Sequence, residues 1–361
     1  MRILQVSDVY FPRVNGVSTS VSTLRQELLS RGHLVTLVVP GYESNGTSEA
    51  GIERVAGRRV PFDPEDRIMR PGPLRELERQ LLTGSFDVVH IHTPFVAHRV
   101  GLRIARTLGL PAVETYHTYF EEYFHHYIPL VPRRALSVLA RRLARRQCNQ
   151  VQRVVVPSQA MRQVLEAYGV RQSVHVIPTG LSFVEMQGGD RNRFRLRHGI
   201  AADRPVLLHV GRMAFEKNIP FLIEVLGRVR DQVPDVLLVL AGAGPASGSI
   251  RAQVERLGLT DLVRFVGYLS RDGSLQDCYE AADLFVFASR TETQGLVLLE
   301  AMACGLPVVS TAVMGTRDIV GPEVGAVAAQ EDVADFSPKV VQLLQDRRRL
   351  ADLRTEALRF S

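Results

Sequence analysis

Cysteine is scarce in this sequence, and the three that occur, Cys148, Cys278 and Cys304, are odd in number and widely spaced. That spacing argues against a disulfide framework and for a reducing compartment, so we expect a cytoplasmic protein. Long apolar runs are also lacking, since no segment approaches the roughly 20 apolar residues that a membrane-spanning helix needs. A secretion signal is not expected, because Arg2 leads directly into a short strand-like segment.

Two motifs are absent as well. The sequence holds no G-x-G-x-x-G, the fingerprint of dinucleotide-binding folds, and no Asp-x-Asp, so an obligate catalytic metal is not expected. Basic residues are not interleaved with aromatic ones as they are in RNA-binding modules, which argues against nucleic acid as a partner. The formal net charge of +6 still suits an anionic partner such as a phosphate ligand or an anionic lipid.

The residues that are present alternate between strand-like and helix-like segments, which is typical of an α/β protein. A strand at 2–7, a loop containing Asn15 and Gly16, a helix at 17–31 and a strand at 34–39 predict a parallel βαβ unit of the phosphate-binding type. From spacing alone, the Asn-Gly pair is equally consistent with a simple tight turn.

The length of 361 residues predicts two domains, each large enough to bury its own core. A second α/β pattern begins at Pro205, and the polar, glycine-rich segment before it is the best linker candidate. We therefore predict domains at 1–185 and 186–361. Segment 41–82 has no clear periodicity, and its proline-rich parts predict loop.

The most informative stretch lies between an apolar strand at 282–288 and another that starts at Val308. A loop containing Glu292 leads into a helix containing Glu300, about two helical turns further on. A helix N-terminus favours a phosphate, and a carboxylate beside it calls for hydroxyl donors such as those of a sugar. The alternative is a capped helix with Glu300 on its solvated face.

Glu-x7-Glu followed by Ala-Met-Ala-Cys-Gly-Leu-Pro-Val-Val resembles the signature of the retaining family-4 glycosyltransferases, which have the GT-B fold of two Rossmann-like domains facing a central cleft. The resemblance implies that Glu292 holds sugar hydroxyls of a nucleotide-sugar donor and that Glu300 holds its ribose. It also implies that the turn between them presents backbone N–H groups to the donor, from Thr293, Gln294, Gly295 and Leu296. Glutamine at 294, where many members have phenylalanine, is similar to the bacterial diacylglycerol glucosyltransferases.

Arg212 and Lys217 lie in a predicted strand-to-helix loop, where both can reach one diphosphate. As an isolated pair they would more often be solvated, but their Gly-Arg-x4-Lys-Asn frame resembles the diphosphate clamp of the same family. The resemblance further implies that Gly16 lets the backbone approach the donor phosphate and that Tyr268 lies in the loop that cradles the base.

Three histidines lie within or at the end of predicted strands of the first domain. His117 lies at a strand end, where open α/β sheets bind ligands, although a lone histidine is more often structural. The resemblance implies that His117 is the active-site histidine near the reacting sugar and the acceptor. His90 and His92 share a strand face, but no carboxylate or cysteine nearby completes a metal site.

The acceptor side is expected in the first domain, at Tyr10, at Glu121 and along a basic amphipathic helix at 132–148. Its apolar side is predicted to contain Leu136, Leu139, Ala140 and Leu143. The helix fits an anionic membrane surface, but it equally fits a surface helix with solvated arginines, and a calmodulin-like partner is a remote third option. The arginines are Arg133, Arg134, Arg141, Arg142, Arg145 and Arg146.

Taken together, the sequence predicts a retaining hexosyltransferase, with UDP-glucose as donor and diacylglycerol as acceptor, peripheral on the inner face of the cell membrane. No residue pair stands out as nucleophile and acid/base, so the resemblance implies front-face attack assisted by the leaving phosphate, with a divalent metal allowed but not required. Alternatives are mannosyl or hexosyl transfer to phosphatidylinositol or to a soluble glycan, a nucleotide-sugar epimerase, and a non-catalytic lipid-binding protein. Family members usually continue past an Ala-x-x-Phe-Ser segment into a crossover helix, so we expect the chain to be truncated at Ser361. The oligomeric state is not predicted.

Overall fold

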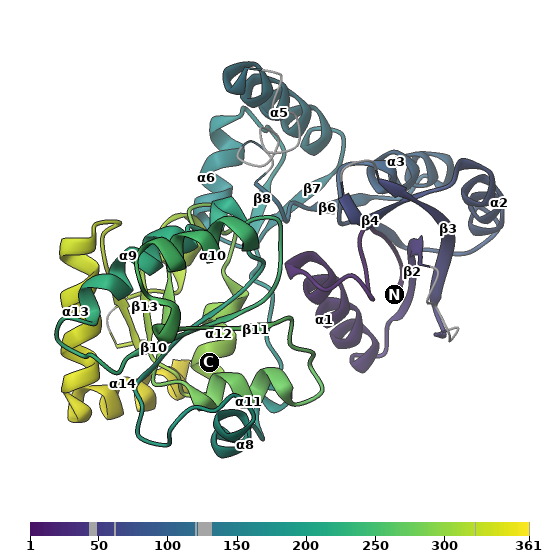
Figure 1. The fold of residues 1–361 in the computed structure, drawn as a ribbon. Coiled ribbons are helices and arrows are strands. Elements are labelled where there is room, and N and C mark those ends of the chain that lie inside the picture. The colour runs from purple at the N-terminus through teal and green to yellow at the C-terminus, as the bar shows by residue number, and fades with distance from the viewer. Residues whose placement is uncertain (43–48, 61–62, 120, 122–131, 322, 361) are drawn as a thin grey trace. The chain divides into compact units, whose positions relative to one another are not determined.

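The computed structural model describes residues 1–42, 49–60, 63–119, 121, 132–321 and 323–360 (Figure 1). Contacts divide the chain into two units, Met1–Gly180 and Leu181–Ser361, which we call unit 1 and unit 2. The division falls a few residues before position 185, where the linker composition placed it. Each unit is an α/β domain built on a largely parallel sheet.

Unit 1 contains an eight-stranded sheet in the order β4-β3-β2-β1-β5-β6-β7-β8. Neighbours pair in parallel except for β3 and β4, which are antiparallel. The strands are β1 (Arg2–Val6), β2 (Leu34–Gly41), β3 (Ile52–Val60), β4 (Asp63–Met69), β5 (Val88–Ile91), β6 (Ala112–Thr115), β7 (Arg153–Val156) and β8 (Val174–Val176). The helices are α1 (Gly16–Ser30), α2 (Pro71–Leu81), α3 (Val96–Leu108), α5 (Arg133–Cys148) and α6 (Gln159–Ala167).

Unit 2 contains a six-stranded parallel sheet in the order β11-β10-β9-β12-β13-β14. The strands are β9 (Val206–Val210), β10 (Leu237–Ala241), β11 (Val263–Gly267), β12 (Leu284–Phe287), β13 (Val308–Ser310) and β14 (Ala326–Ala328). The α-helices are α7 (Phe183–Met186), α8 (Arg191–Arg197), α9 (Ile219–Val229), α10 (Ser247–Arg256), α11 (Ser274–Ala281), α12 (Leu296–Ala303), α13 (Val333–Gln345) and α14 (Arg347–Phe360). The 3-10 helices are η1 (Phe215–Lys217), η2 (Thr260–Leu262) and η3 (Met314–Asp318).

Both sheets follow the doubly wound strand order, which confirms the prediction of Rossmann-like domains. In such sheets the order reverses beside the first strand, and ligands bind at the carboxyl ends of the two strands that flank this point. The flanking strands are β1 and β5 in unit 1, and β9 and β12 in unit 2. The loops after these strands are therefore where a site is expected.

The central strands of unit 2 are buried on both faces, as a parallel sheet with helices on either side requires. Leu207 and Leu238 contribute to a core with α9, α10 and α13, whereas the alternate residues Leu208 and Leu237 contribute to a core with α11 and α12. Strands β9 and β12 also pair directly, with Leu208 opposite Phe285, and this pairing fixes the register of the two strands.

Two loop predictions are wrong. Segment 41–82 forms β3, β4 and α2, with Pro71 in the first turn of α2, where a missing N–H costs nothing. The expected linker at 186–198 is mostly helical, because Asp190 accepts hydrogen bonds from the N–H groups of Asn192 (2.8 Å) and Arg193 (3.0 Å) and so caps α8.

The three cysteine thiols are free and buried. Across the described ranges, we find no helix with the length and apolarity needed to cross a bilayer.

Candidate active site

The loop after β9 carries Arg212 and Lys217, and it is fixed by backbone contacts with the loop after β10. The N–H of Gly211 donates to the carbonyl of Ala241 (2.9 Å), and that of Met213 donates to the carbonyl of Ala243 (3.0 Å). At Gly242, whose φ is +139°, a side-chain Cβ would lie 1.9 Å from the Gly211 carbonyl oxygen, so only glycine fits. The close approach of these two backbones fixes the position of the Arg212 backbone.

Lys217 ends the short helix η1 and forms an ion pair with Glu292, which follows β12. The two side chains retain only 17% and 16% of their exposure. Burial alone would raise the pKa of Glu292, but the Lys217 ammonium, with smaller help from the Ser289 hydroxyl, holds it below its ordinary value. The structure therefore brings together two residues that the sequence placed in separate motifs, at the expected edge of the sheet.

The turn after Glu292 leads into α12 through Gly295, whose backbone is left-handed (φ +94°). A side chain there would be strained and would approach Thr316 Cγ2 to 2.9 Å. Within the described part of the chain, no side chain caps the first turn of α12, and the Leu298 N–H donates to the Gly295 carbonyl at 2.9 Å. A helix N-terminus of this kind favours an anion. Gln294 is buried, whereas Thr293 and Leu296 are half-buried.

Glu300 lies in α12 and is 3% exposed, which rules out the solvated-face alternative. One oxygen pairs with the guanidinium of Arg271, and the other accepts a hydrogen bond from the Tyr279 hydroxyl at 2.9 Å. Arg271 lies in the loop after β11, three positions beyond the exposed ring of Tyr268. Arg271 was missed by the sequence analysis, because nothing in its spacing links it to Glu300.

His209 was missed as well. It lies near the end of β9, is 1% exposed, and its Nδ1 is 3.3 Å from the carbonyl oxygen of Val286. Burial lowers its pKa to about 4, so the ring is neutral beneath the Lys217–Glu292 pair. The apolar pattern of β9 does not indicate that the His209 ring contacts a carbonyl of the neighbouring strand.

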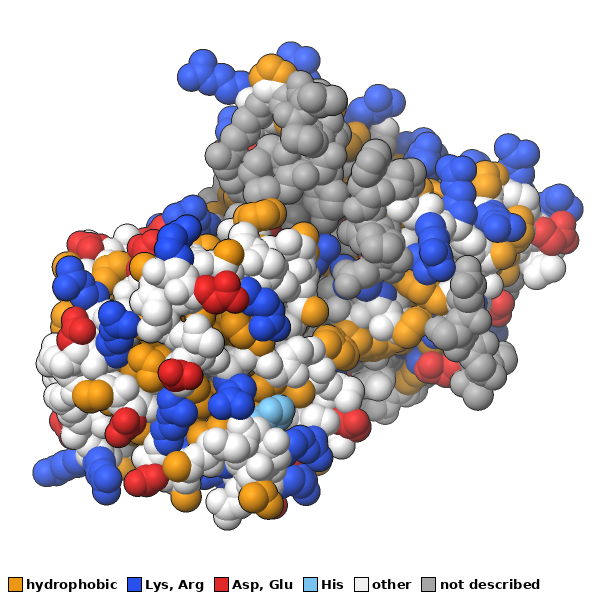
Figure 2. Space-filling model, in the orientation of Figure 1, with side chains coloured by type: hydrophobic (Ala, Val, Ile, Leu, Met, Phe, Trp, Pro, Cys, Tyr) orange, Lys and Arg blue, Asp and Glu red, His pale blue; other side chains and the backbone are white. Residues whose placement is uncertain are grey.

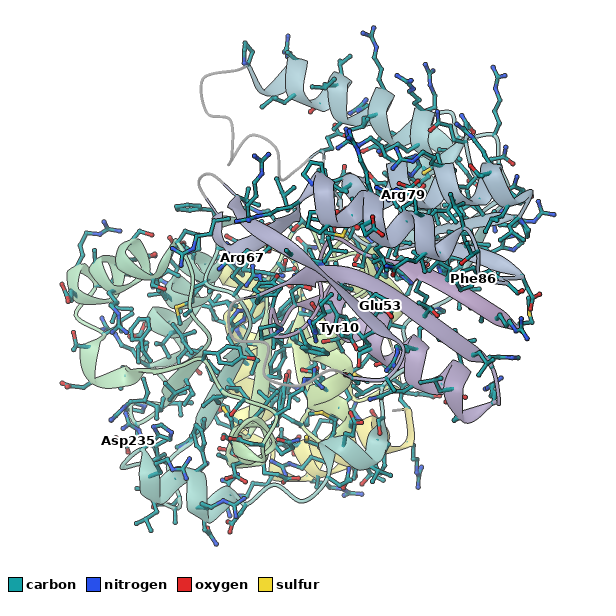
Figure 3. All side chains as sticks on the ribbon, turned by 90° about the vertical axis from the view of Figure 1, so that its right-hand side faces the viewer. Tyr10, Glu53, Arg67, Arg79, Phe86 and Asp235 are labelled. Carbon is teal, nitrogen blue, oxygen red and sulfur yellow. The ribbon has the colours of Figure 1, made fainter. Side chains whose placement is uncertain are left out.

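In unit 1, Asn15 caps α1 by accepting a hydrogen bond from the Ser18 N–H at 2.9 Å, so the Asn-Gly pair is a helix start. Gly16 is exposed, with open space where a side chain would project. Tyr10 is only 3% exposed (Figure 3), and its ring packs edge-on against Phe11 at 5.2 Å. Its side chain thus belongs to the interior of unit 1.

His90, His92 and His117 form a stack at the carboxyl ends of β5 and β6. The ring centres of His90 and His92 are 4.1 Å apart, and Nδ1 of His92 is 3.1 Å from Nε2 of His117. Burial lowers the pKa of all three rings, to about 4 for His90 and about 3 for His117. They are therefore neutral, and no group of three metal-ligating side chains is arranged around an ion anywhere in the described residues.

The basic helix α5 buries a narrow stripe made by Leu136, Ala140, Ala144 and Cys148. The expectation that Leu139 lies on the packed side is wrong, because it is 56% exposed, beside Val138 at 46%. The buried apolar face is therefore narrower than the helical wheel suggested. Arginine side chains project from several points of unit 1 in Figure 2, and unit 1 contains no lysine.

Glu121 is buried, and its carboxylate accepts hydrogen bonds from Nε (3.0 Å) and Nη2 (2.6 Å) of Arg141. It also accepts one from the hydroxyl of Tyr168. The Arg141 guanidinium also lies 5.7 Å from the centre of the Tyr168 ring. Glu121 and Arg141 thus hold α5 to α6, although the Arg141 side chain is itself 56% exposed. The other arginines of the helix whose side chains are described are exposed as well: Arg134, Arg142, Arg145 and Arg146. The side chain of Arg133 lies outside the described residues.

Comparison with known proteins gives one consistent result. The family model described as "Glycosyltransferase Family 4" matches residues 14–183, and that described as "Glycosyl transferases group 1" matches residues 190–360. The alpha-monoglucosyldiacylglycerol synthase of Streptococcus pneumoniae is 33% identical over 320 residues, which cover 86% of this chain and 71% of that protein.

Two further likenesses are more distant. The GDP-mannose-dependent alpha-(1-6)-phosphatidylinositol dimannoside mannosyltransferase of Mycobacterium tuberculosis is 27% identical over 91% of this chain and 84% of that protein. The crystal structure of Anabaena Alr3699/HepE in complex with UDP and glucose has a TM-score of 0.78 at 19% identity, and covers 99% of this chain and 94% of that one. Such a structural likeness, with the two Rossmann-like units, shows the GT-B fold.

Proposed function

The chain belongs to the family 4 glycosyltransferases, and we propose that it transfers a hexose from a nucleotide sugar to a membrane lipid with retention at the anomeric carbon. We take glucose from UDP-glucose as the sugar and diacylglycerol as the acceptor. The relative at 33% identity is named a monoglucosyldiacylglycerol synthase, which supports this choice. Membership of a glycosyltransferase family leaves no support for the epimerase or for the non-catalytic lipid-binding protein.

The Lys217–Glu292 ion pair carries the proposal. It lies between two loops at the reversal point of the second sheet, next to the first turn of α12, which no described side chain caps. In our proposal the donor diphosphate binds there, where Arg212, Lys217 and the helix N–H groups stabilise the charge that develops as it departs. Glu292 then accepts hydrogen bonds from sugar hydroxyls, and Glu300 from those of the ribose.

The two carboxylates are already engaged, Glu292 by Lys217 and Glu300 by Arg271 and Tyr279, so we assign neither the role of nucleophile. In the proposed step, the acceptor hydroxyl oxygen forms a bond to the anomeric carbon as the bond to the diphosphate oxygen breaks. Both events occur on one face of the sugar, which retains the configuration. The acceptor proton passes to the departing phosphate, and the cationic side chains supply the charge that a divalent metal would otherwise provide.

We propose that the exposed face of α5 brings the enzyme to the bilayer surface. Val138 and Leu139 are exposed in the midst of four exposed arginines, a combination that suits the boundary between headgroups and acyl chains. In our proposal the enzyme is peripheral on the cytoplasmic, inner face of the cell membrane.

A radiolabelled-donor assay tests the proposal. UDP-[14C]glucose is supplied with diacylglycerol in phosphatidylglycerol vesicles, and the lipid product is treated with α- and β-glucosidases. We expect a labelled monoglycosyl lipid that only the α-glucosidase cleaves. Absence of lipid product, or a product cleaved by the β-glucosidase, would contradict the acceptor or the stereochemistry.

The second candidate is transfer of mannose to phosphatidylinositol, which the 27% identical mycobacterial relative favours because it covers 91% of this chain. GDP-[14C]mannose with phosphatidylinositol in the same vesicles provides the matching arm. Labelling of a soluble glycan in preference to either lipid would point to a third class of acceptor.

A further inference from the structure

The carboxylate of Glu300 is held by two partners that differ in how far solvent reaches them. The Tyr279 hydroxyl donates a hydrogen bond to Oε2 at 2.9 Å, and Tyr279 is completely buried. Nη2 of Arg271 donates to Oε1, and the Arg271 side chain keeps 31% of its exposure. Tyr279 therefore holds Glu300 from the core, whereas Arg271 is the partner that a ligand arriving from solvent would meet.

The core of unit 2 fixes the position of Tyr279. The residue lies in α11, and its ring centre is 6.0 Å from that of Phe285 in β12, which is also buried. Burial, and then the negative charge of Glu300, raise the pKa of the Tyr279 hydroxyl well above its ordinary 10. The hydroxyl therefore keeps its proton and acts as the donor in the bond to Glu300.

The contact of Arg271 with its carboxylate involves one oxygen. Elsewhere in unit 2, Arg193 donates from Nε and from Nη2 to the two carboxylate oxygens of Asp277, both at 2.6 Å. Such a two-point pair is the stronger arrangement for a guanidinium and a carboxylate. Among the described contacts Arg271 reaches only Oε1 of Glu300, and Oε2 is the oxygen that Tyr279 holds.

We propose that Tyr279 is a positioning residue that keeps Glu300 open to the ribose of the donor, by holding Oε2 back from Arg271. A guanidinium bound to both oxygens would cover the edge of the carboxylate that the two neighbouring hydroxyls of a ribose share. With the contact limited to Oε1, these hydroxyls compete with one hydrogen bond of Arg271 and not with two. This rests on the proposed function, in which Glu300 binds the ribose.

The consequence is selectivity for ribose. Hydrogen bonds to a charged group are worth more than neutral ones, so a nucleotide without ribose hydroxyls should bind about 10- to 100-fold more weakly. Without the Tyr279 hydroxyl, Glu300 can turn and pair with Arg271 through both oxygens, and this selectivity should be lost. Lysine cannot make the two-point contact. Replacing Arg271 with lysine in the same variant should therefore restore the selectivity.

Tyr168 provides the matched control in unit 1. It donates to the carboxylate of Glu121, which an arginine also binds. There Arg141 keeps a two-point contact, from Nε to Oε2 at 3.0 Å and from Nη2 to Oε1 at 2.6 Å. Tyr168 is only half-buried, so its hydroxyl can shift to admit the guanidinium, which the enclosed ring of Tyr279 cannot do. Y168F removes an equivalent hydroxyl from a carboxylate outside unit 2.

The test is isothermal titration calorimetry with UDP and with 2′,3′-dideoxy-UDP, which lacks both ribose hydroxyls. In the wild type we expect the dideoxy compound to bind about 10- to 100-fold more weakly. In Y279F the affinity for UDP should fall about tenfold while that for dideoxy-UDP stays unchanged. Y279F/R271K should regain the wild-type ratio of the two Kd values, and Y168F should keep it. Recovery in Y279F/R271K, which lacks the same hydroxyl, would show that Y279F is folded.

Three results would overturn the proposal: equal affinities for the two nucleotides in the wild type, an unchanged ratio in Y279F, and a loss in Y279F that R271K does not restore. The last result would mean that packing alone depends on the hydroxyl. If the ratios behave as expected but the radiolabelled donor yields no glycolipid, the proposed acceptor fails while the Tyr279 assignment stands.

Discussion

Replacing Lys217 with methionine tests the centre of the proposed donor site. The K217M change keeps the apolar stem and removes the charge that faces Glu292. Removal of one partner from a buried ion pair costs about 3–5 kcal/mol. Because these side chains keep 17% and 16% of their exposure, we expect a smaller loss of unfolding free energy, about 2–3 kcal/mol at neutral pH.

The pH dependence of this loss follows from Glu292. Its folded pKa lies below the ordinary 4.5, so its stabilisation is fully present above pH 4.5 and disappears as the pH falls through the folded value. In K217M the burial that raises the Glu292 pKa is no longer opposed by the Lys217 ammonium, and only smaller effects such as that of the Ser289 hydroxyl remain. The gap between wild type and K217M, measured as the urea midpoint by circular dichroism, should therefore be widest near neutrality and close in acid.

Catalysis should suffer more than folding. Loss of a cation that stabilises a departing diphosphate lowers kcat by about 10²- to 10³-fold. The matched control is the double variant K217M/E292Q, in which no buried carboxylate remains without its partner. It should recover much of the lost stability and none of the activity. Wild-type kcat in K217M, or a stability gap that does not depend on pH, would refute the assigned roles of both residues.

Three further predictions concern other parts of the chain. G295V should unfold at a lower temperature and lose UDP binding by calorimetry, because valine disfavours the left-handed backbone and would meet Thr316, and an unchanged UDP affinity would count against α12 as the phosphate site. The Glu114 carboxylate overcomes the effect of burial and raises the pKa of His98 above its ordinary 6.5, so the stabilisation from this pair is full below pH 6.5 and is lost as the pH rises through the folded value. The stability advantage over H98Q should therefore shrink as the pH rises above 6.5, and a constant gap would contradict the pairing. Replacing Arg142, Arg145 and Arg146 of α5 with serine should lower sedimentation with phosphatidylglycerol vesicles several-fold. The control R75S/R79S on α2 should sediment as the wild type does, and an equal loss in both variants would mean that net charge alone acts.

Much of the fold was predictable because its strands are short apolar runs ended by glycine-containing loops. The order of these runs predicted both Rossmann-like units. Serine is a residue type that often begins a helix, and the Ser158 hydroxyl caps α6 by accepting from the Met161 N–H at 3.2 Å. Strand β3 and the edge strand β4 escaped prediction, because they pair with each other antiparallel and charged residues interrupt their apolar patterns.

The candidate site was likewise predictable only in part. Lys217 and Glu292 were predictable individually, because each lies in a loop directly after a strand, but their ion pair depends on β9 and β12 being neighbours in the sheet. The pairing of Arg271 with Glu300 and the contact of His92 with His117 join different elements at no regular spacing. Only the packed structure places these partners together.

The burial of every native thiol has a practical use. Burial raises the pKa of Cys148, Cys278 and Cys304, so at neutral pH they remain protonated as well as shielded, and should react slowly with maleimides. One cysteine introduced on the exposed face of α5, or at Tyr268 in the loop after β11, would then take up a fluorophore selectively in an otherwise native enzyme. Vesicle docking and nucleotide capture could be followed as separate optical signals, each from its own half of the chain.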